Sequence, residues 1–279
     1  MTRTLLKGRW GAPAILLVGA VAFGLGLWAR VSLHPGPTGL ERLIAQNAPA
    51  ENVQALTARL TGAAEYLVGT SLGVIHGAGK KWARLPGPET AVRSIAALPD
   101  GTLLVAGHGT GVAKYQESGL MPVLPGDADA IAATPSGRLY AILSGRQVVT
   151  SSDGGKTWVQ AASFGGEQML ALAAGEAGVA VGGLQGSIFF SPDGGRTWES
   201  RPAPGGSVTA LLFDPSKSGR LWACAGGAAL YSDDDGTTWR QPALKKAANR
   251  PLVALSPAPA GQTGIAAVSA DGLLVTMGD

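Results

Sequence analysis

SPDGGRTW, at residues 191–198, is the middle copy of a motif that occurs three times in this chain of 279 residues. The first copy is SSDGGKTW at residues 151–158, and the third is SDDDGTTW at residues 232–239. All three fit the pattern S-x-D-x-G-x-T-W, and their starts lie 40 and 41 residues apart. Five specified positions at a constant spacing identify an internal repeat, and a period of about 40 residues is typical of one four-stranded propeller blade.

The sequence around the three copies repeats one order of features, from an apolar strand through a Pro/Gly turn and two further strands to the motif and its tryptophan. Weaker copies precede the motif: residues 67–82 keep Gly79 and Trp82, and residues 103–122 keep only Gly119. After residue 239 the chain supplies three more strand-like runs and no further tryptophan. We therefore predict an all-β fold, a β-propeller of six four-stranded blades over residues 52–279, with five or seven blades as alternatives.

The motif resembles the Asp-box (BNR) repeat of sialidases, sortilin-type receptors and the photosystem II assembly-factor family. From the residues themselves, we expect each Asp to accept hydrogen bonds from backbone N–H groups of its own turn. We expect each Gly to adopt positive φ and each Trp to pack between neighbouring sheets. We therefore assign a structural role to the residues of the three boxes, namely Ser151, Asp153, Gly155, Thr157, Trp158, Ser191, Asp193, Gly195, Thr197, Trp198, Ser232, Asp234, Gly236, Thr238 and Trp239.

The box carboxylates do not predict a metal site. Three boxes on three blades cannot converge on one cation, and a calcium ion needs six to eight oxygen ligands. DDDG at residues 233–236 matches the start of a calcium-binding loop weakly, and it lacks the downstream Glu. We therefore predict neither a metal nor a cofactor.

Residues 10–29 form an uncharged apolar run of 20 residues. As a helix, at 1.5 Å per residue, this run is about 30 Å long, enough to cross the hydrocarbon core of a bilayer. Three basic residues lie within residues 1–9 and only Arg30 follows closely, so the positive-inside rule places residues 1–9 in the cytoplasm. We predict a single-pass anchor in the cytoplasmic (inner) membrane, with the propeller on the periplasmic or extracellular side. A cleaved signal peptide is the alternative, although the run is long for one and lacks an A-x-A site.

Residues 30–51 contain a stretch bounded by Pro and Gly and are predicted to be a linker. The sixth repeat ends before its outer strand, so residues 39–46 are a candidate for a strand that closes the ring. A helix or a loose linker in this stretch is the alternative.

The composition restricts the possible functions. The chain has 42 Gly and 18 Pro, which indicates many tight turns, and Ala and Gly are abundant enough to suggest a bacterial protein. Its formal charge is +3, but four of the 22 Lys and Arg flank the apolar run; the remaining 18, against 19 Asp and Glu, leave a charge near −1. Nucleic acid is therefore not an expected partner. Cys224 is the only cysteine, which excludes an intramolecular disulfide and a multi-cysteine metal site.

Candidate binding residues follow from the expected positions of the loops. The box turns and the turns at residues 99–101 and 135–137 should share one face. The other face should hold the loops at residues 107–111, 143–147, 182–186 and 225–229, together with the segments that link the blades. Ligand sites gather where loops surround a channel. The candidates for binding a ligand or partner are therefore Arg93, His108, Asp129, Arg146, Glu167, Gln185 and Arg250.

Two classes of function fit this architecture. The resemblance to the assembly-factor family implies a non-catalytic protein that binds a membrane-protein partner, often through arginines on one face. A rigid disc with variable loops equally suits a scaffold that binds a protein or a glycan. We therefore predict a non-enzymatic, membrane-anchored binding protein that acts outside the cytoplasm.

The alternative is a sialidase-like glycoside hydrolase, which needs an arginine cluster, a Tyr–Glu pair and an Asp acid/base. Arg84-Leu85-Pro86 is similar to the Arg-Ile-Pro motif of that family, and Glu65 adjoins Tyr66. However, adjacent residues of a strand point to opposite faces, and Arg84 is expected on an outer strand. Serine or cysteine hydrolase chemistry is not indicated, because no G-x-S-x-G motif accompanies the three histidines.

Overall fold

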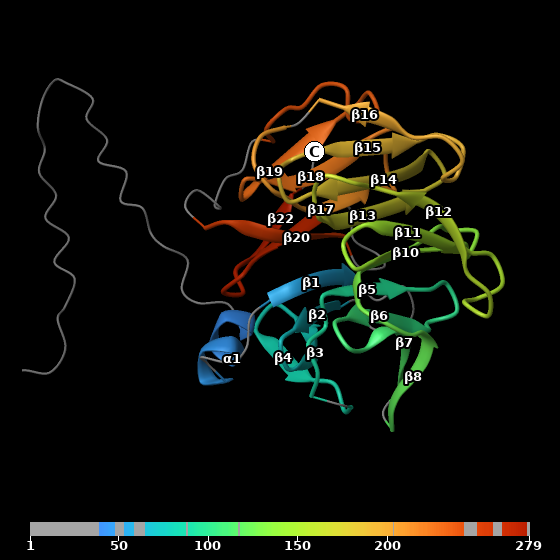
Figure 1. The fold of residues 1–279 in the computed structure, drawn as a ribbon. Coiled ribbons are helices and arrows are strands. Elements are labelled where there is room, and N and C mark those ends of the chain that lie inside the picture. Colours follow the sequence, from blue (N-terminus) through green and yellow to red (C-terminus); the bar gives the residue numbers. More distant parts are fainter. Residues whose placement is uncertain are drawn as a thin grey trace, which may run out of the picture. The chain divides into compact units, whose positions relative to one another are not determined.

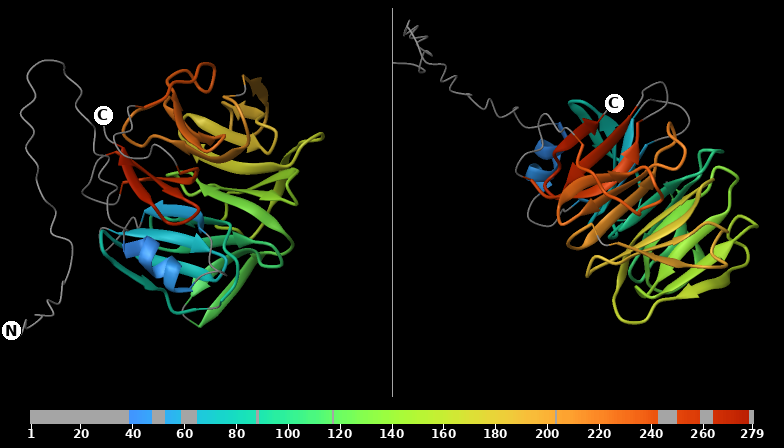
Figure 2. Two further views of the ribbon diagram at one scale, coloured as in Figure 1. Left: turned by 90° about the vertical axis from the view of Figure 1, so that its left-hand side faces the viewer. Right: turned by 90° about the horizontal axis from the view of Figure 1, so that it is seen from above.

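Short apolar strands joined by tight turns account for most of this chain, and they assemble into six antiparallel sheets. The computed structural model describes residues 39–47, 53–58, 65–87, 89–116, 118–202, 204–242, 250–258 and 264–277. Within these residues, helix α1 (Gly39–Asn47) is followed by 22 strands. The sheets are arranged in chain order around a central axis (Figures 1 and 2), which confirms the six-bladed β-propeller.

Each blade is a meander in which sequential strands pair, with the first strand innermost. Blades 1 and 2 comprise β1 (Val53–Ala58), β2 (Tyr66–Thr70), β3 (Gly73–Ala78), β4 (Lys81–Arg84), and β5 (Ser94–Ala97), β6 (Leu103–Gly107), β7 (Gly111–Gln116), β8 (Gly119–Leu124). Blades 3 and 4 comprise β9 (Ala128–Ala133), β10 (Leu139–Leu143), β11 (Gln147–Ser151), β12 (Val159–Ser163), and β13 (Met169–Gly175), β14 (Gly178–Gly183), β15 (Ile188–Ser191), β16 (Glu199–Arg201). Blades 5 and 6 comprise β17 (Val208–Phe213), β18 (Leu221–Ala225), β19 (Ala228–Ser232), and β20 (Leu252–Pro257), β21 (Ile265–Ser269), β22 (Leu274–Met277).

The predicted four strands are confirmed for blades 1 to 4 only. In blade 5 the described residues beyond β19 contribute a single antiparallel bridge, between Tyr231 and Arg240. In blade 6 the described residues form three strands. The closing strand predicted at residues 39–46 is wrong, because these residues belong to helix α1 and pair with no sheet.

The ring closes through the same backbone contact that joins other neighbouring blades. Val53 N–H donates to the carbonyl oxygen of Ala270 at 3.2 Å, which connects blade 1 to blade 6. At the junction of blades 3 and 4, Met169 N–H donates in the same way to Gly145 at 2.7 Å. Among the described residues, the ring is therefore closed by the same type of backbone hydrogen bond that joins other neighbouring blades, and not by a strand shared between the first and last blades.

Helix α1 packs against the seam between blades 6 and 1. Its buried Ile44 belongs to a core cluster with Val53 of blade 1 and Val268 of blade 6. Gly272, in the turn between β21 and β22, has φ +93°, and a Cβ atom there would lie 2.8 Å from Ile44 Cδ1. The helix can approach this turn because glycine leaves the space open.

The apolar core lies between adjacent blades. One cluster joins Ile142 of blade 3 to Met169 and Val181 of blade 4, and another joins Ile188 of blade 4 to Leu221 of blade 5. Each sheet is therefore buried on both faces by its neighbours. This explains why the inner and middle strands are almost continuous apolar runs, whereas β12 (Val159–Ser163) is largely exposed.

The Asp-boxes form the expected turns. The Asp153 carboxylate accepts hydrogen bonds from the backbone N–H groups of Lys156 and Thr157 and from the hydroxyls of Thr157 and Ser151, at 2.6 to 2.9 Å. These bonds, led by the Thr157 hydroxyl, lower the pKa of Asp153. Gly155 has φ +87°, in the region that glycine adopts without strain.

The second and third boxes repeat this geometry. The Thr197 N–H and hydroxyl donate to Asp193 at 2.9 and 2.7 Å, and those of Thr238 donate to Asp234 at 2.8 and 2.6 Å. Hydrogen bonds from the Ser232 hydroxyl first, and then from Thr238, lower the pKa of Asp234 to about 2.

The box tryptophans pack between neighbouring blades, as predicted, and the structure shows that each packs toward the preceding blade. Trp158, Trp198 and Trp239 contact the clusters between blades 2 and 3, 3 and 4, and 4 and 5, respectively. The boxes therefore fix both their own turns and the packing between blades.

The predicted membrane anchor at residues 10–29 lies outside the described residues. Among the described residues, no helix has the length and apolar character that crossing a membrane requires.

Candidate functional site

The two ends of each meander define two faces of the propeller. The box face carries the Asp-box turns and the turns after each first strand; the loop face carries the turns between second and third strands and the segments that link the blades. A central cavity runs between the faces, because its lining includes Pro99 and Pro135 from the box face and Arg93 and Asp129 from the loop face.

Three of the predicted binding residues meet on the loop face. Arg93, before β5, donates from Nη1 to Asp129 Oδ1 at 2.6 Å and lies 2.6 Å from His108 Nε2. His108, in the turn between β6 and β7, lies 3.2 Å from the same carboxylate oxygen. The Asp129 side chain is 2% exposed, whereas those of Arg93 and His108 are 36% and 53% exposed. The cluster therefore connects blades 2 and 3, with the Asp129 carboxylate buried and the Arg93 and His108 side chains in contact with solvent.

The chemistry of this cluster is limited by its pairing. Because a guanidinium is always a donor, His108 Nε2 accepts from Arg93 when the imidazole is neutral. The second Asp129 oxygen accepts the backbone N–H of Gly145 at 2.6 Å. Among the described residues, no hydroxyl or thiol hydrogen-bonds to His108, so the Asp–His pair contacts no side-chain nucleophile there.

Carboxylates near the starts of inner strands hold the loops on this face. Glu167, which is 8% exposed, accepts the backbone N–H groups of Gln185 at 2.5 Å and Ser187 at 3.2 Å. Asp129 does the same for Gly145, and Asp127 accepts the N–H of Gly109 at 2.7 Å. The loops of blades 2, 3 and 4 are therefore each fixed by a carboxylate at the start of an inner strand.

Two shortlisted side chains lie in the solvent on these fixed loops. Arg146 and Gln185 are exposed, and Arg146 forms no ion pair with the residues that the structure describes. Leu184 lies beside Gln185 and is 50% exposed, a large value for an apolar side chain. The sequence analysis missed Leu184, although a leucine between glycines in an expected loop was a usable signal.

Arg250 does not belong to this group. Its guanidinium pairs with Glu41 of α1 and, at 3.2 Å, with Asp271 of blade 6. The structure therefore places it at the seam between blades 6 and 1, where it connects the helix to the propeller.

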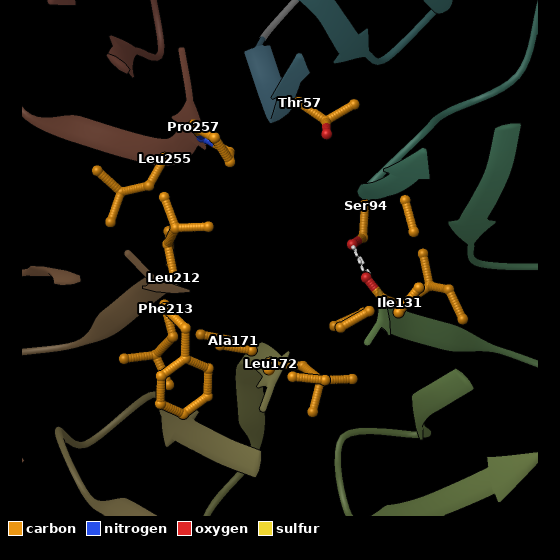
Figure 3. Close-up of a pocket in the computed structure, with 18 of the residues that line it drawn as sticks. Thr57, Ser94, Ile131, Ala171, Leu172, Leu212, Phe213, Leu255 and Pro257 are labelled. Atoms are coloured by element: carbon orange, nitrogen blue, oxygen red, sulfur yellow. Dashed lines mark hydrogen bonds between the residues drawn. The ribbon is translucent and has the colours of Figure 1, made fainter. Parts of the chain in front are cut away.

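The central cavity has a volume of about 600 Å³ and is lined by the inner strands. Leu172, Leu212 and Leu255 lie at its wall (Figure 3). Several polar residues at the loop-face end of the cavity occupy the same position in their blades, a β-bulge near the start of the inner strand. Gln54 lies in the bulge between Val53 and Ala55, and Thr209 lies in the bulge between Val208 and Ala210. Sequence analysis missed Gln54 and Thr209, which an alignment of the first strands would have placed together.

We name the six residues at this repeated position the bulge ring: Gln54, Arg93, Asp129, Leu170, Thr209 and Val253.

The residues of the hydrolase alternative do not converge. Arg84 lies in outer strand β4 and donates to the carbonyl oxygen of Leu72 at 2.7 Å. Glu65 pairs with His76 at 3.0 Å, while the adjacent Tyr66 is buried in the core. None of these residues lines the cavity.

The fold and its box turns define a six-bladed β-propeller of the Asp-box type. No protein-family model matches the sequence, and no curated protein is significantly similar to it. The chain is similar in structure to YCF48 from Cyanidioschyzon merolae, with 18% identity and a TM-score of 0.54 over 80% of this chain and 81% of that one.

Two further solved structures show the same fold. A structure described as YCF48 bound to D1 peptide has 20% identity and a TM-score of 0.55, covering 82% of this chain and 79% of that one. The extracellular domain of the one-component system BT4673 from B. thetaiotaomicron has 15% identity and a TM-score of 0.57, with 80% of this chain but only 32% of that one covered. The predicted resemblance to Asp-box propellers is confirmed as a likeness of fold.

Proposed function

We propose that this protein is a non-catalytic scaffold that binds a protein partner through the loop face of blades 3 and 4. The observation that carries the proposal is the exposed Leu184, held on a loop whose backbone is anchored by the buried Glu167. A rigid loop loses little conformational freedom on binding, so an apolar side chain on it contributes more of its burial energy to affinity.

The exposed side chains around Leu184 suggest the chemistry of the partner. Arg146, in the neighbouring blade, supplies a cation without an ion-pair partner among the described residues, and Gln185 supplies an amide. An apolar anchor surrounded by polar and basic groups is typical of a protein interface. A partner segment with an apolar side chain next to a carboxylate fits this surface. The description of YCF48 bound to a D1 peptide supports a peptide rather than a glycan.

We also propose that residues 10–29 anchor the propeller in the cytoplasmic membrane of a bacterium, with the loop face available outside the cytoplasm. The length of the apolar run and the basic residues before it support this orientation. Alkaline phosphatase fused after residue 279 tests it, because the fused enzyme is active only outside the cytoplasm. A fusion protein that is fully expressed but has no phosphatase activity would refute the orientation.

Site-specific photocrosslinking in intact cells tests the scaffold function. A benzoylphenylalanine at position 184 should capture a discrete partner, whereas the same residue at Val159 should not. Val159 is the matched control because it is also exposed, at 66%, but lies on an outer strand of blade 3. When the benzoylphenylalanine is moved to an adjacent position of the same loop, Leu184→Asp and Arg146→Glu should each weaken capture of the partner at least tenfold. Equal capture from positions 184 and 159, or none from either, would refute the proposed surface.

A further inference from the structure

Helix α1 joins the propeller at the loop face. Its first turn lies against the turn between β21 and β22, since a Cβ atom at Gly272 would be 3.4 Å from the backbone nitrogen of Glu41. The Glu41 carboxylate also pairs with Arg250, in the segment that leads into blade 6. Both the β21–β22 turn and this segment belong to the loop face. The chain before residue 39 therefore reaches the propeller on the loop-face side of its rim, where α1 lies beside β4 (Figure 1).

The helix is fixed to the blades. Ile44 is 6% exposed and packs in one cluster with Val53 of blade 1 and Val268 of blade 6. Burial of an isoleucine side chain contributes about 1.5–3 kcal/mol, which keeps the helix attached to the seam. The chain between the proposed anchor at residues 10–29 and this attachment point is therefore residues 30–38, which we name the tether.

The tether is short compared with the depth of the propeller. Its nine residues span at most about 30 Å when fully extended. Strand β13 has 7 residues, or about 24 Å, and the turns at its two ends add to this depth. To place the box face on the bilayer, the tether would have to run along the whole rim almost fully extended, which costs conformational entropy. To place the loop face there requires no such extension.

The charges of the loop face do not favour adhesion to lipid. Asp127 is exposed on this face, and the Asp271 side chain is 60% exposed. Anionic lipid head groups repel carboxylates. The apolar Leu184, which is 50% exposed beside polar side chains of the same face, suits a protein surface instead.

From these observations we propose that the loop face is turned toward the membrane, and that the partner bound at Leu184 is the extracytoplasmic segment of an integral membrane protein. The proposal rests on the anchor and the binding surface proposed above, and it adds the orientation of the propeller and the class of its partner. An attachment point within about 30 Å of the bilayer keeps the loop face within reach of loops and termini that emerge from neighbouring membrane proteins. The box face then points away from the membrane.

Energy transfer from the propeller to labelled lipid measures this orientation in the full-length protein in nanodiscs. The donor dye is attached at Ser144→Cys, on the loop face, or at Ser152→Cys, on the box face. Both serines are exposed, and they lie in the turns at opposite ends of β11 in blade 3. The strand separates them by about 17 Å, so the transfer efficiency should be at least about twofold greater from position 144. The native Cys224 is fully buried and does not compete for the dye.

Changes to the attachment test whether it sets the orientation. Ile44→Asp should release α1, lengthen the tether and make transfer from positions 144 and 152 nearly equal. Gln46→Asp is the matched control, because Gln46 is exposed on the same helix, and it should leave the difference unchanged. An insertion of about twenty Gly and Ser residues after residue 38 should also remove the difference, and it leaves every propeller residue in place. An unchanged difference in the insertion variant would refute the argument from tether length.

The outcomes separate this proposal from the proposed function. Equal transfer from the two positions, or greater transfer from position 152, with the protein retained in the nanodiscs, refutes the orientation and leaves the anchor and the Leu184 surface standing. No transfer from either position, with the protein lost from the nanodiscs, refutes the anchor and with it the orientation. The partner captured at position 184 should remain in the membrane after alkaline carbonate extraction. A captured partner that carbonate extracts is not an integral membrane protein, and the proposed class of partner would then be wrong.

Discussion

Replacement of Trp198 by alanine is the most direct test of how the Asp-boxes stabilise the propeller. The half-buried indole packs edge-on against Phe164, with ring centroids 5.3 Å apart, and its N–H donates to Gly195 at 3.1 Å. Loss of a buried aromatic ring costs about 3–5 kcal/mol, and part of this ring is exposed, so we expect about 3 kcal/mol. In a domain of this size that corresponds to a drop in Tm of about 6–12 °C.

Two further variants make the measurement decisive. Trp198→Phe retains most of the packing and loses the N–H bond, so it should cost about 1 kcal/mol. Arg250→Ala removes an exposed ion pair with Glu41 and should cost about 0–1 kcal/mol, a shift of at most about 4 °C. Differential scanning calorimetry of the three variants gives the comparison. If Trp198→Ala and Arg250→Ala lower Tm by the same small amount, the box tryptophans do not hold the blades together.

Three other predictions concern single groups of the propeller. Acid should destabilise the protein, because the Asp234 pKa is lowered to about 2; its contribution is complete above about pH 5 and is lost as the pH falls from 4 toward 2. Urea unfolding at each pH should show this loss, and Asp234→Asn should show a weaker dependence. Asp235 has φ +56° where the other boxes have Gly154 and Gly194, so Asp235→Gly should raise stability by about 0.5–1 kcal/mol; a lower Tm would contradict this. Cys224 is fully buried, and burial raises its pKa to about 12, so a disulfide reagent should label it only at the rate of unfolding; immediate labelling of the folded protein would show that the core is open.

Much of the architecture could be predicted because the contacts that define it are local. The hydrogen bonds that the Ser and Asp side chains of a box accept or donate join residues at most four positions apart, so the turn is encoded within eight letters of sequence. Repetition then predicted six blades, with five and seven as alternatives, because most of the motif is missing in blades 1 and 2.

Helix α1 shows where prediction from sequence failed. Residues 39–46 were a candidate closing strand, because a segment with apolar residues can pair with the free edge of a blade that lacks its outer strand. The stretch folds as a helix because Ile44 fits into a core made by Val53 and Val268, residues from opposite ends of the propeller sequence. Contacts of that range are invisible in a local pattern.

The candidate site was predicted in part. Arg93, His108 and Asp129 do meet, since the loops that carry them belong to adjacent blades. Arg250 was grouped with them because it also lies in a segment that links blades, but it pairs with Glu41, 209 positions away in the chain. The sequence could have marked Leu184 as a leucine in an expected loop, but its exposure became known only from which side chains the fold covers.

The sequence by itself determined that this chain is a propeller of about six blades, because each blade repeats a turn whose stabilising contacts lie within one motif. The tertiary structure decided how the ring closes, which loops are held by Asp129 and Glu167, and which residues line the central cavity. Those features depend on contacts between blades, and each such contact joins positions that have no relation in the local sequence.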